Sequence, residues 1–183
     1  MANAQEKKQL DIPISIAYYG HYITHNGIKI GTQYDWKEWE KTKVRKRGNL
    51  NKQRKIFASP QIGLYRHPKN HTGLLFNVDI GYQRSRGQRK TYTAYALGLG
   101  YMTQINSGIT YVYKSDDSLE EKKWASRGYF MPTLNTEIGR RINHKVGWYS
   151  KLSLGSKLNY NTGKSLEFFL ELGAKINIKN KKG

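Results

Sequence analysis

The sequence predicts an all-β fold, an antiparallel up-and-down transmembrane β-barrel of about 8–10 strands. Three observations predict it. Apolar side chains recur at every second position from residue 12 to residue 178, as in strands whose two faces differ. The chain has 14 tyrosines and 18 glycines but only 4 prolines, which favours strands and tight turns. No stretch approaches the roughly 18 consecutive apolar residues of a spanning helix, so a helical membrane protein is excluded.

The alternation divides into about nine segments. Residues 166–178 form the clearest one, because the pattern runs through it without a phase error. The predicted strands cover residues 12–23, 27–38, 55–66, 73–84, 90–105, 108–114, 128–142, 146–160 and 166–178. Single-chain bacterial barrels have an even number of strands. Either residues 12–23 are therefore a lumenal or periplasmic piece, which leaves eight strands, or a tenth strand has been missed.

The connections between these segments alternate in length and character. Tight-turn sequences occupy residues 24–27, 105–108 and 143–145, and the first ends in the Asn-Gly pair that two-residue hairpins favour. Charged and longer connections occupy residues 39–54 and 115–127, with shorter ones at 84–90 and 160–165. Short turns at one end and longer polar loops at the other are typical of bacterial outer-membrane barrels.

The polar face of the strands indicates which side points inward. Glycines lie on it in almost every strand, where they would make room for larger side chains in a narrow lumen. Charges of both signs also lie on it at mid-strand, and buried charges persist only when they are paired. The predicted lumen charge network consists of Lys29, Asp35, Asp79, Glu137, Arg141, Lys151, Lys157, Glu167, Glu171 and Lys175. The alternative is that this face is the solvated outside of a soluble barrel.

Aromatic residues on the apolar face gather near the strand ends. Two such belts are expected where amphipathic rings sit at the two interfaces of a membrane. The predicted girdle consists of Tyr34, Trp36, Tyr82, Tyr95, Tyr113 and Tyr160 toward the longer loops, and of Tyr101 and Trp148 toward the tight turns.

One domain is expected to occupy residues 12–178, flanked by short terminal segments. Residues 1–11 are interpreted as a flexible leader remnant, because Ala2-Asn3-Ala4 resembles the small-x-small end of a signal peptide. Residues 179–183 form a basic tail. The formal net charge of +19 requires an anionic partner or an anionic neighbourhood.

The basic residues concentrate in the first two longer connections. If these face outward, their guanidinium and ammonium groups would meet the phosphates of lipopolysaccharide. The predicted contact residues are Lys43, Arg45, Lys46, Arg47, Arg54, Lys55, Arg84, Arg86, Arg89 and Lys90. The expected partners are therefore outer-membrane lipids and lipopolysaccharide, together with a larger envelope complex, and no nucleic acid is expected.

Residues 12–178 resemble the small outer-membrane β-barrel superfamily of Gram-negative bacteria. The run IGLYRHPKNHTGLLFNVDIGYQR from Ile62, continued to Gly98-Leu99-Gly100-Tyr101, resembles a subgroup of small barrels with no assigned activity. The resemblance implies a location in the bacterial outer membrane. One departure is the last strand, which ends in Ile176-Asn177-Ile178 and a basic tail rather than in an aromatic residue.

No catalytic, cofactor-binding or metal-binding residues are predicted. His67 and His71, at a spacing of four, lack a nearby Asp, Glu or Cys, and the five histidines are interpreted as turn and interface residues. There is no cysteine and no phosphate-binding loop. The function predicted from these observations is that of a non-enzymatic structural or accessory barrel of the envelope. The alternatives are a lipid A-modifying enzyme of the same fold and a soluble basic β-protein that binds nucleic acid.

Overall fold

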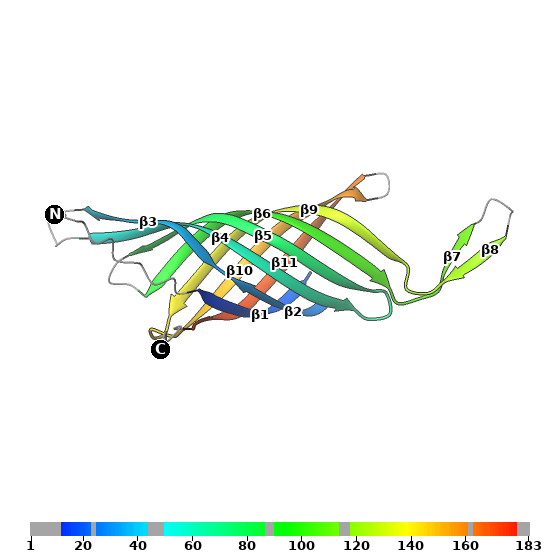
Figure 1. The fold of residues 1–183 in the computed structure, drawn as a ribbon, viewed down its shortest axis with the longest axis horizontal. Helices are drawn as coiled ribbons and strands as arrows, with labels where there is room; N and C mark the ends of the chain where they lie inside the picture. Colours follow the sequence, from blue (N-terminus) through cyan, green and yellow to red (C-terminus); the bar gives the residue numbers. More distant parts are fainter. Residues whose placement is uncertain are drawn as a thin grey trace, which may run out of the picture.

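A computed structural model describes residues 12–22, 25–43, 50–86, 90–113, 118–160 and 163–178. Within these ranges there are eleven strands (Figure 1). They are β1 (Pro13–His21), β2 (His25–Thr32), β3 (Tyr34–Lys43), β4 (Leu50–His67), β5 (His71–Arg86), β6 (Thr91–Asn106), β7 (Thr110–Tyr113), β8 (Leu119–Lys122), β9 (Ser126–Arg141), β10 (Val146–Tyr160) and β11 (Gly163–Asn177). None of these residues belongs to a helix long and apolar enough to cross a membrane.

Eight strands close into one antiparallel barrel. The sheet runs in the order β2-β1-β11-β10-β9-β6-β5-β4-β3, and a further pairing of β2 with β4 closes it. β2 and β3 are separated only by Gln33, and they pair with the two halves of β4 in succession. They are therefore two parts of one barrel strand. The predicted all-β, up-and-down barrel is confirmed.

The predicted strand assignment had one error. Residues 12–23, which one of the two alternatives placed outside the barrel wall, contain β1, a full barrel strand paired with both β2 and β11. The surplus segment was 108–114. It contains β7, which pairs only with β8 in a separate two-stranded sheet that projects from the barrel at the right of Figure 1. The alternation of residues 108–114 belongs to a local hairpin, which periodicity alone cannot distinguish from a spanning strand.

This error also reversed the direction of every later strand in the prediction. One end of the barrel, here called the terminus rim, holds the start of β1, the ends of β3, β5, β9 and β11, and the starts of β4, β6 and β10. The other end, the hairpin rim, holds the ends of β1, β4, β6 and β10, and the starts of β2, β5, β9 and β11. The sequence had suggested that the connections 39–54, 84–90, 115–127 and 160–165 share one rim. Instead, the strands that flank 39–54 and 84–90 meet them at the terminus rim, and the strands that flank 115–127 and 160–165 meet them at the hairpin rim.

The outward face of the barrel is apolar and the inward face is closely packed. Along β6, outward Tyr95, Leu97 and Leu99 are 58%, 66% and 58% exposed, whereas inward Ala94 and Ala96 are buried. A globular core would show the opposite distribution, because apolar side chains are normally removed from water. This exposed apolar face is the surface that a bilayer would cover.

The lumen is filled by side chains rather than by water. Tyr19, Tyr65, Leu75 and Phe169 are among the buried residues of an inner cluster, and the rings of Tyr19 and Phe169 stack with centroids 5.0 Å apart. Glycine at position 98 is required by this packing, since a Cβ there would lie 2.2 Å from Oγ1 of Thr133. The central cavity beside the polar network measures only about 10 Å³, which is room for one water molecule. Among the residues that the structure describes, side chains close the barrel at its middle.

Candidate functional site

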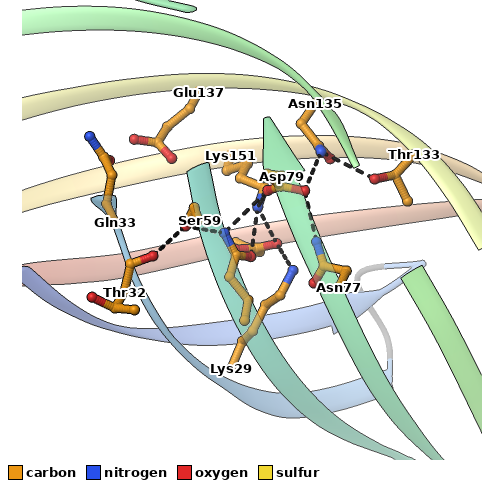
Figure 2. A network of polar contacts seen from close by, with 12 residues as sticks. Lys29, Thr32, Gln33, Ser59, Asn77, Asp79, Thr133, Asn135, Glu137 and Lys151 are labelled. Atoms are coloured by element: carbon orange, nitrogen blue, oxygen red, sulfur yellow. Dashed lines mark hydrogen bonds and ion pairs between the residues drawn. The ribbon is translucent and has the colours of Figure 1, made fainter. Parts of the chain in front are cut away.

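A buried ionic network occupies the middle of the lumen (Figure 2). Nζ of Lys151 on β10 donates to Oδ2 of Asp79 on β5 at 2.7 Å and lies 3.3 Å from Oε1 of Glu171 on β11. Nζ of Lys29 on β2 donates to the same Glu171 oxygen at 2.7 Å. Asn77 and Asn135 donate to Oδ1 of Asp79 at 2.7 and 2.9 Å. The network thus joins strands from opposite walls of the barrel.

Two smaller groups flank this centre along the barrel axis. Toward the terminus rim, Lys175 and Tyr92 donate to Oε1 of Glu137 at 2.5 and 2.8 Å. Toward the hairpin rim, Nζ of Lys157 lies 2.8 Å from Oε1 of Glu167. The three groups together contain four lysines and four carboxylates, so the interior carries no net formal charge from these residues. The excess positive charge of the chain therefore lies outside the lumen.

Eight of the ten residues assigned to the lumen network lie in these groups. Asp35 and Arg141 do not, because both are exposed at the terminus rim. Asp35 instead accepts a hydrogen bond from Nζ of Lys55 at 2.8 Å. Both residues line a polar cavity at this rim rather than the packed middle of the lumen.

The aromatic residues assigned to the girdle lie mostly on the outward face. Tyr34, Trp36, Tyr95, Tyr101 and Trp148 are exposed, and Tyr82 is half-buried. The side chains of Tyr113 and Tyr160 lie outside the described part of the structure. Trp148 is opposite Arg140 in the register of β10 and β9, which places it toward the terminus rim with Tyr95 rather than with Tyr101.

Those basic residues assigned to anion contacts that the structure describes lie toward the terminus rim. Arg45, Lys46, Arg47 and Arg89 lie outside the described residues, and of Lys43 and Arg86 only the backbone is described. Arg54 and Arg84 are directly opposite each other on β4 and β5. Lys55 points the other way and binds Asp35 and Glu38. Lys90 donates to the carbonyl oxygen of Ile142 at 3.2 Å.

The same rim opens into a polar cavity of about 520 Å³. Its lining includes Gln33, Asp35, Lys55, Arg141 and Lys175, which come from β3, β4, β9, β11 and the β2–β3 junction. The ion pairs Lys55–Asp35 and Lys175–Glu137 leave little uncompensated charge on this wall. The cavity ends at the packed lumen and is a mouth rather than a channel.

A histidine cluster at the hairpin rim was missed by the sequence analysis. Nε2 of His21 contacts Oε2 of Glu167, and the His21 ring packs against Tyr65 and Phe169. A carboxylate that orients an imidazole also occurs in catalytic sites, and His21 is only 4% exposed in this structure. The signal was available, because His21 and His25 flank one turn of this rim and His67 and His71 flank another.

Comparison with known proteins gives a fold and no sequence family. No family model matches the chain, and no curated protein matches it. The crystal structure of the outer membrane enzyme PagL superposes with a TM-score of 0.54 at 11% identity, over 91% of this chain and 99% of that one. Neisserial surface protein A (NspA) gives a TM-score of 0.52 at 10% identity, over 92% of this chain and 96% of that one.

The chain has the fold of the small outer-membrane β-barrels of Gram-negative bacteria. The resemblance proposed from the sequence is thereby confirmed. The exposed apolar belt and this fold together place the barrel in the bacterial outer membrane, as expected.

The expectation that the chain is not an enzyme is overturned. It rested on the absence of a recognisable catalytic motif in the sequence. PagL, which has this fold over nearly its whole length, is an outer membrane enzyme. Barrels of this fold therefore include an enzyme, and the fold by itself does not determine the function.

Proposed function

We propose that this barrel binds the phosphate groups of anionic membrane lipids through the outward face of β3, β4 and β5 at the terminus rim. The residues of this basic face are Lys37, Lys41, Lys52, Arg54 and Arg84. The observation that carries the proposal is the direct cross-strand pairing of Arg54 with Arg84. Like charges directly opposite each other destabilise a sheet. An anion bound between the two guanidinium groups would offset this repulsion.

The register continues the basic face on both sides of this arginine pair. Lys41 is opposite Lys52, and Lys52 is in turn opposite Arg86 in the backbone register. On the outward face of β3 to β5 in the described ranges 34–43, 50–58 and 78–86, no acidic residue interrupts the series. Nε of Arg54 is buried and, within the described structure, has no hydrogen-bond partner.

The inward face of the same three strands is neutralised by its own acids. Lys55 pairs with Asp35 at 2.8 Å and with Glu38 at 3.6 Å. Gln53 donates to Oε1 of Glu40 at 2.7 Å. The contrast between the two faces supports an external anionic partner for the arginine pair of the outward face.

The depth of the basic face suits a lipid headgroup. The next outward pair toward the middle of the barrel is Ile56 and Tyr82, and Tyr82 is opposite Tyr95. Tyrosine rings favour the membrane interface, so the arginine pair, two residues farther along each strand, lies at the level of the phosphates. Each such cation near an anionic surface contributes about 1 kcal/mol.

The placement of the longest connection favours the inner leaflet. This connection joins the end of β6 to the start of β9 and contains β7 and β8, so it belongs to the hairpin rim. Outer-membrane barrels carry their longer loops outside and their short turns in the periplasm. The terminus rim then faces the periplasm, where the phosphates belong to phospholipids. Lipopolysaccharide, the partner suggested by the sequence, would meet the opposite rim.

The test uses the double variant Arg54→Gln/Arg84→Gln and the matched control Lys122→Gln/Lys123→Gln, two exposed residues at the hairpin rim. Each protein is reconstituted with phosphatidylglycerol, with phosphatidylcholine or with lipopolysaccharide, and the lipids retained after mild delipidation are counted by native mass spectrometry. We expect the arginine variant to lose about 2 kcal/mol of affinity for phosphatidylglycerol, or roughly thirtyfold. The control should retain that lipid like the wild type.

Two outcomes would overturn the proposal. Equal retention of phosphatidylglycerol by the arginine variant and the wild type would mean that the basic face does not bind lipid phosphate, and a protein partner of the envelope would become the better candidate. Selective loss of lipopolysaccharide in the arginine variant would show that the anion belongs to the outer leaflet. That result would reverse the orientation assigned above.

A further inference from the structure

One strand at the terminus rim has an open edge. β3 is the last strand in the order of the main sheet, and within the described residues it pairs only with β4. β2, which precedes β3 in the same barrel strand, is covered on its other side by β1 as far as Ile14 opposite Thr32. β1 begins at Pro13, so no described strand continues this cover along β3. One row of main-chain N–H and C=O groups of β3 therefore lies along the edge without a strand partner.

The open edge lies at the level of the lipid headgroups and beyond. Trp39 on β3 is opposite Arg54, the arginine assigned above to the level of the phosphates, and Lys41 and Lys43 follow it toward the rim. Open sheet edges do not occur in the hydrocarbon region of a bilayer, because no water satisfies their main-chain groups there. Above that region, an extended segment of another chain can satisfy such an edge by adding a strand to the sheet.

The side chains of β3 specify what an added strand must carry. Residues 37–41 read Lys-Glu-Trp-Glu-Lys, which is the same sequence in both directions, and the four charged side chains are exposed. No ion pair of the described residues includes Lys37 or Lys41. Opposite charges across a strand pair are stabilising. An added strand therefore needs an acidic residue opposite each lysine, a basic residue opposite each glutamate and an apolar residue opposite Trp39.

The same sequence disfavours a second copy of this chain as the partner. Two copies of β3 paired antiparallel about Trp39 would place lysine opposite lysine and glutamate opposite glutamate. Like charges directly opposite each other destabilise a strand pair. Charged side chains on an edge strand are also a common protection against association with identical edges. A strand from a different protein fits this edge better.

We propose that the open edge of β3 docks an extended segment of another envelope protein, in which five successive residues are acidic, basic, apolar, basic and acidic. Main-chain hydrogen bonds would hold the segment, and the alternating charges would select it. The site is independent of the lipid binding proposed above, because Arg54 and Arg84 lie on the face of the sheet rather than along its edge.

The test is a peptide titration of the full-length, isotope-labelled protein in a zwitterionic detergent, followed by the backbone amide signals in nuclear magnetic resonance spectra. The matching peptide contains Glu-Lys-Val-Lys-Glu, and the control peptide contains Lys-Glu-Val-Glu-Lys, which has the same composition and net charge. Two further matching peptides carry N-methyl groups, one on the valine and one on both lysines, because successive N–H groups of a strand point to opposite edges. A protein without residues 1–11 is titrated in parallel.

We expect the matching peptide to shift the amide signals of residues 37–41 and to bind the wild type about tenfold more tightly than the control peptide. One N-methylated peptide should lose binding and the other should retain it. The variant Lys37→Glu/Glu38→Lys/Glu40→Lys/Lys41→Glu should prefer the control peptide instead.

The proposal is overturned if the matching peptide leaves the wild-type signals unchanged, if both peptides bind equally, or if the two N-methylated peptides bind alike. Binding that appears only after residues 1–11 are removed would also overturn it. The edge would then belong to the chain's own N-terminal segment rather than to another protein.

Discussion

At the scale of single residues, the interior depends on Lys151. It is 3% exposed and contacts Asp79, Glu171 and the amide oxygen of Gln61 at 2.9 Å. Its two carboxylate partners come from β5 and β11 and Gln61 comes from β4, so the ammonium group of this β10 residue links four strands. Removing one member of a buried ion pair is costly because the other member stays buried without its counter-charge.

We therefore predict that Lys151→Met destabilises the folded barrel by about 3–5 kcal/mol. The measurement is the free energy of unfolding in urea, followed by tryptophan fluorescence in lipid vesicles. Lys145→Met, which changes an exposed turn lysine, is the control and should change this free energy little. A loss for Lys151→Met no larger than that of the control would show that the network does not stabilise the barrel.

The sequence identified most of these lumen residues but not their partners. Alternation places Asp79, Lys151 and Glu171 on the polar face of their strands. The partners could not be predicted because β5 and β10 are not neighbours in the sheet, and the contact crosses the lumen. The histidine cluster was missed for the same reason, since it requires the closing pairing of β2 with β4.

At the scale of elements, the β7–β8 hairpin is the part least connected to the rest. Its strands pair only with each other in the described structure, and Figure 1 shows it projecting beyond the barrel wall. The barrel instead joins β6 directly to β9, from Thr91 opposite Arg140 to Ile105 opposite Ser126. The hairpin therefore contributes nothing to closure.

We predict that replacing residues 109–123 by a short Gly-Ser linker leaves the barrel folded and equally stable, because every barrel pairing is kept. Heat-dependent gel mobility and urea unfolding in vesicles measure both properties. A variant that no longer refolds would contradict the assignment of 108–114 to a hairpin outside the barrel. That result would instead support a spanning strand at residues 108–114, as predicted from the sequence.

At the scale of the whole molecule, the distribution of apolar and polar side chains in the barrel is the opposite of that in a soluble globular protein. Leucines, isoleucines and tyrosines cover its outside, while paired charges and amides fill the lumen of the described barrel. Alternation and glycine placement predicted this inversion, because only a closed lumen makes use of small residues and opposite charges on one face. The strand count and the assignment of connections to the two rims required the structure. One hairpin counted as a spanning strand reverses the direction assigned to every later strand.

The most direct test of this account uses the absence of cysteine from the chain. Single cysteines are introduced at Ala94, Tyr95, Ala96, Leu97, Leu99 and Met102 of β6, spin-labelled, and examined in lipid vesicles for collision with oxygen, which concentrates in the bilayer. We predict strong collision at 95, 97 and 99 and shielding at 94, 96 and 102. The opposite alternation, in a protein that stays monodisperse in buffer without detergent, would contradict the account, because the apolar face would then be the core of a soluble protein.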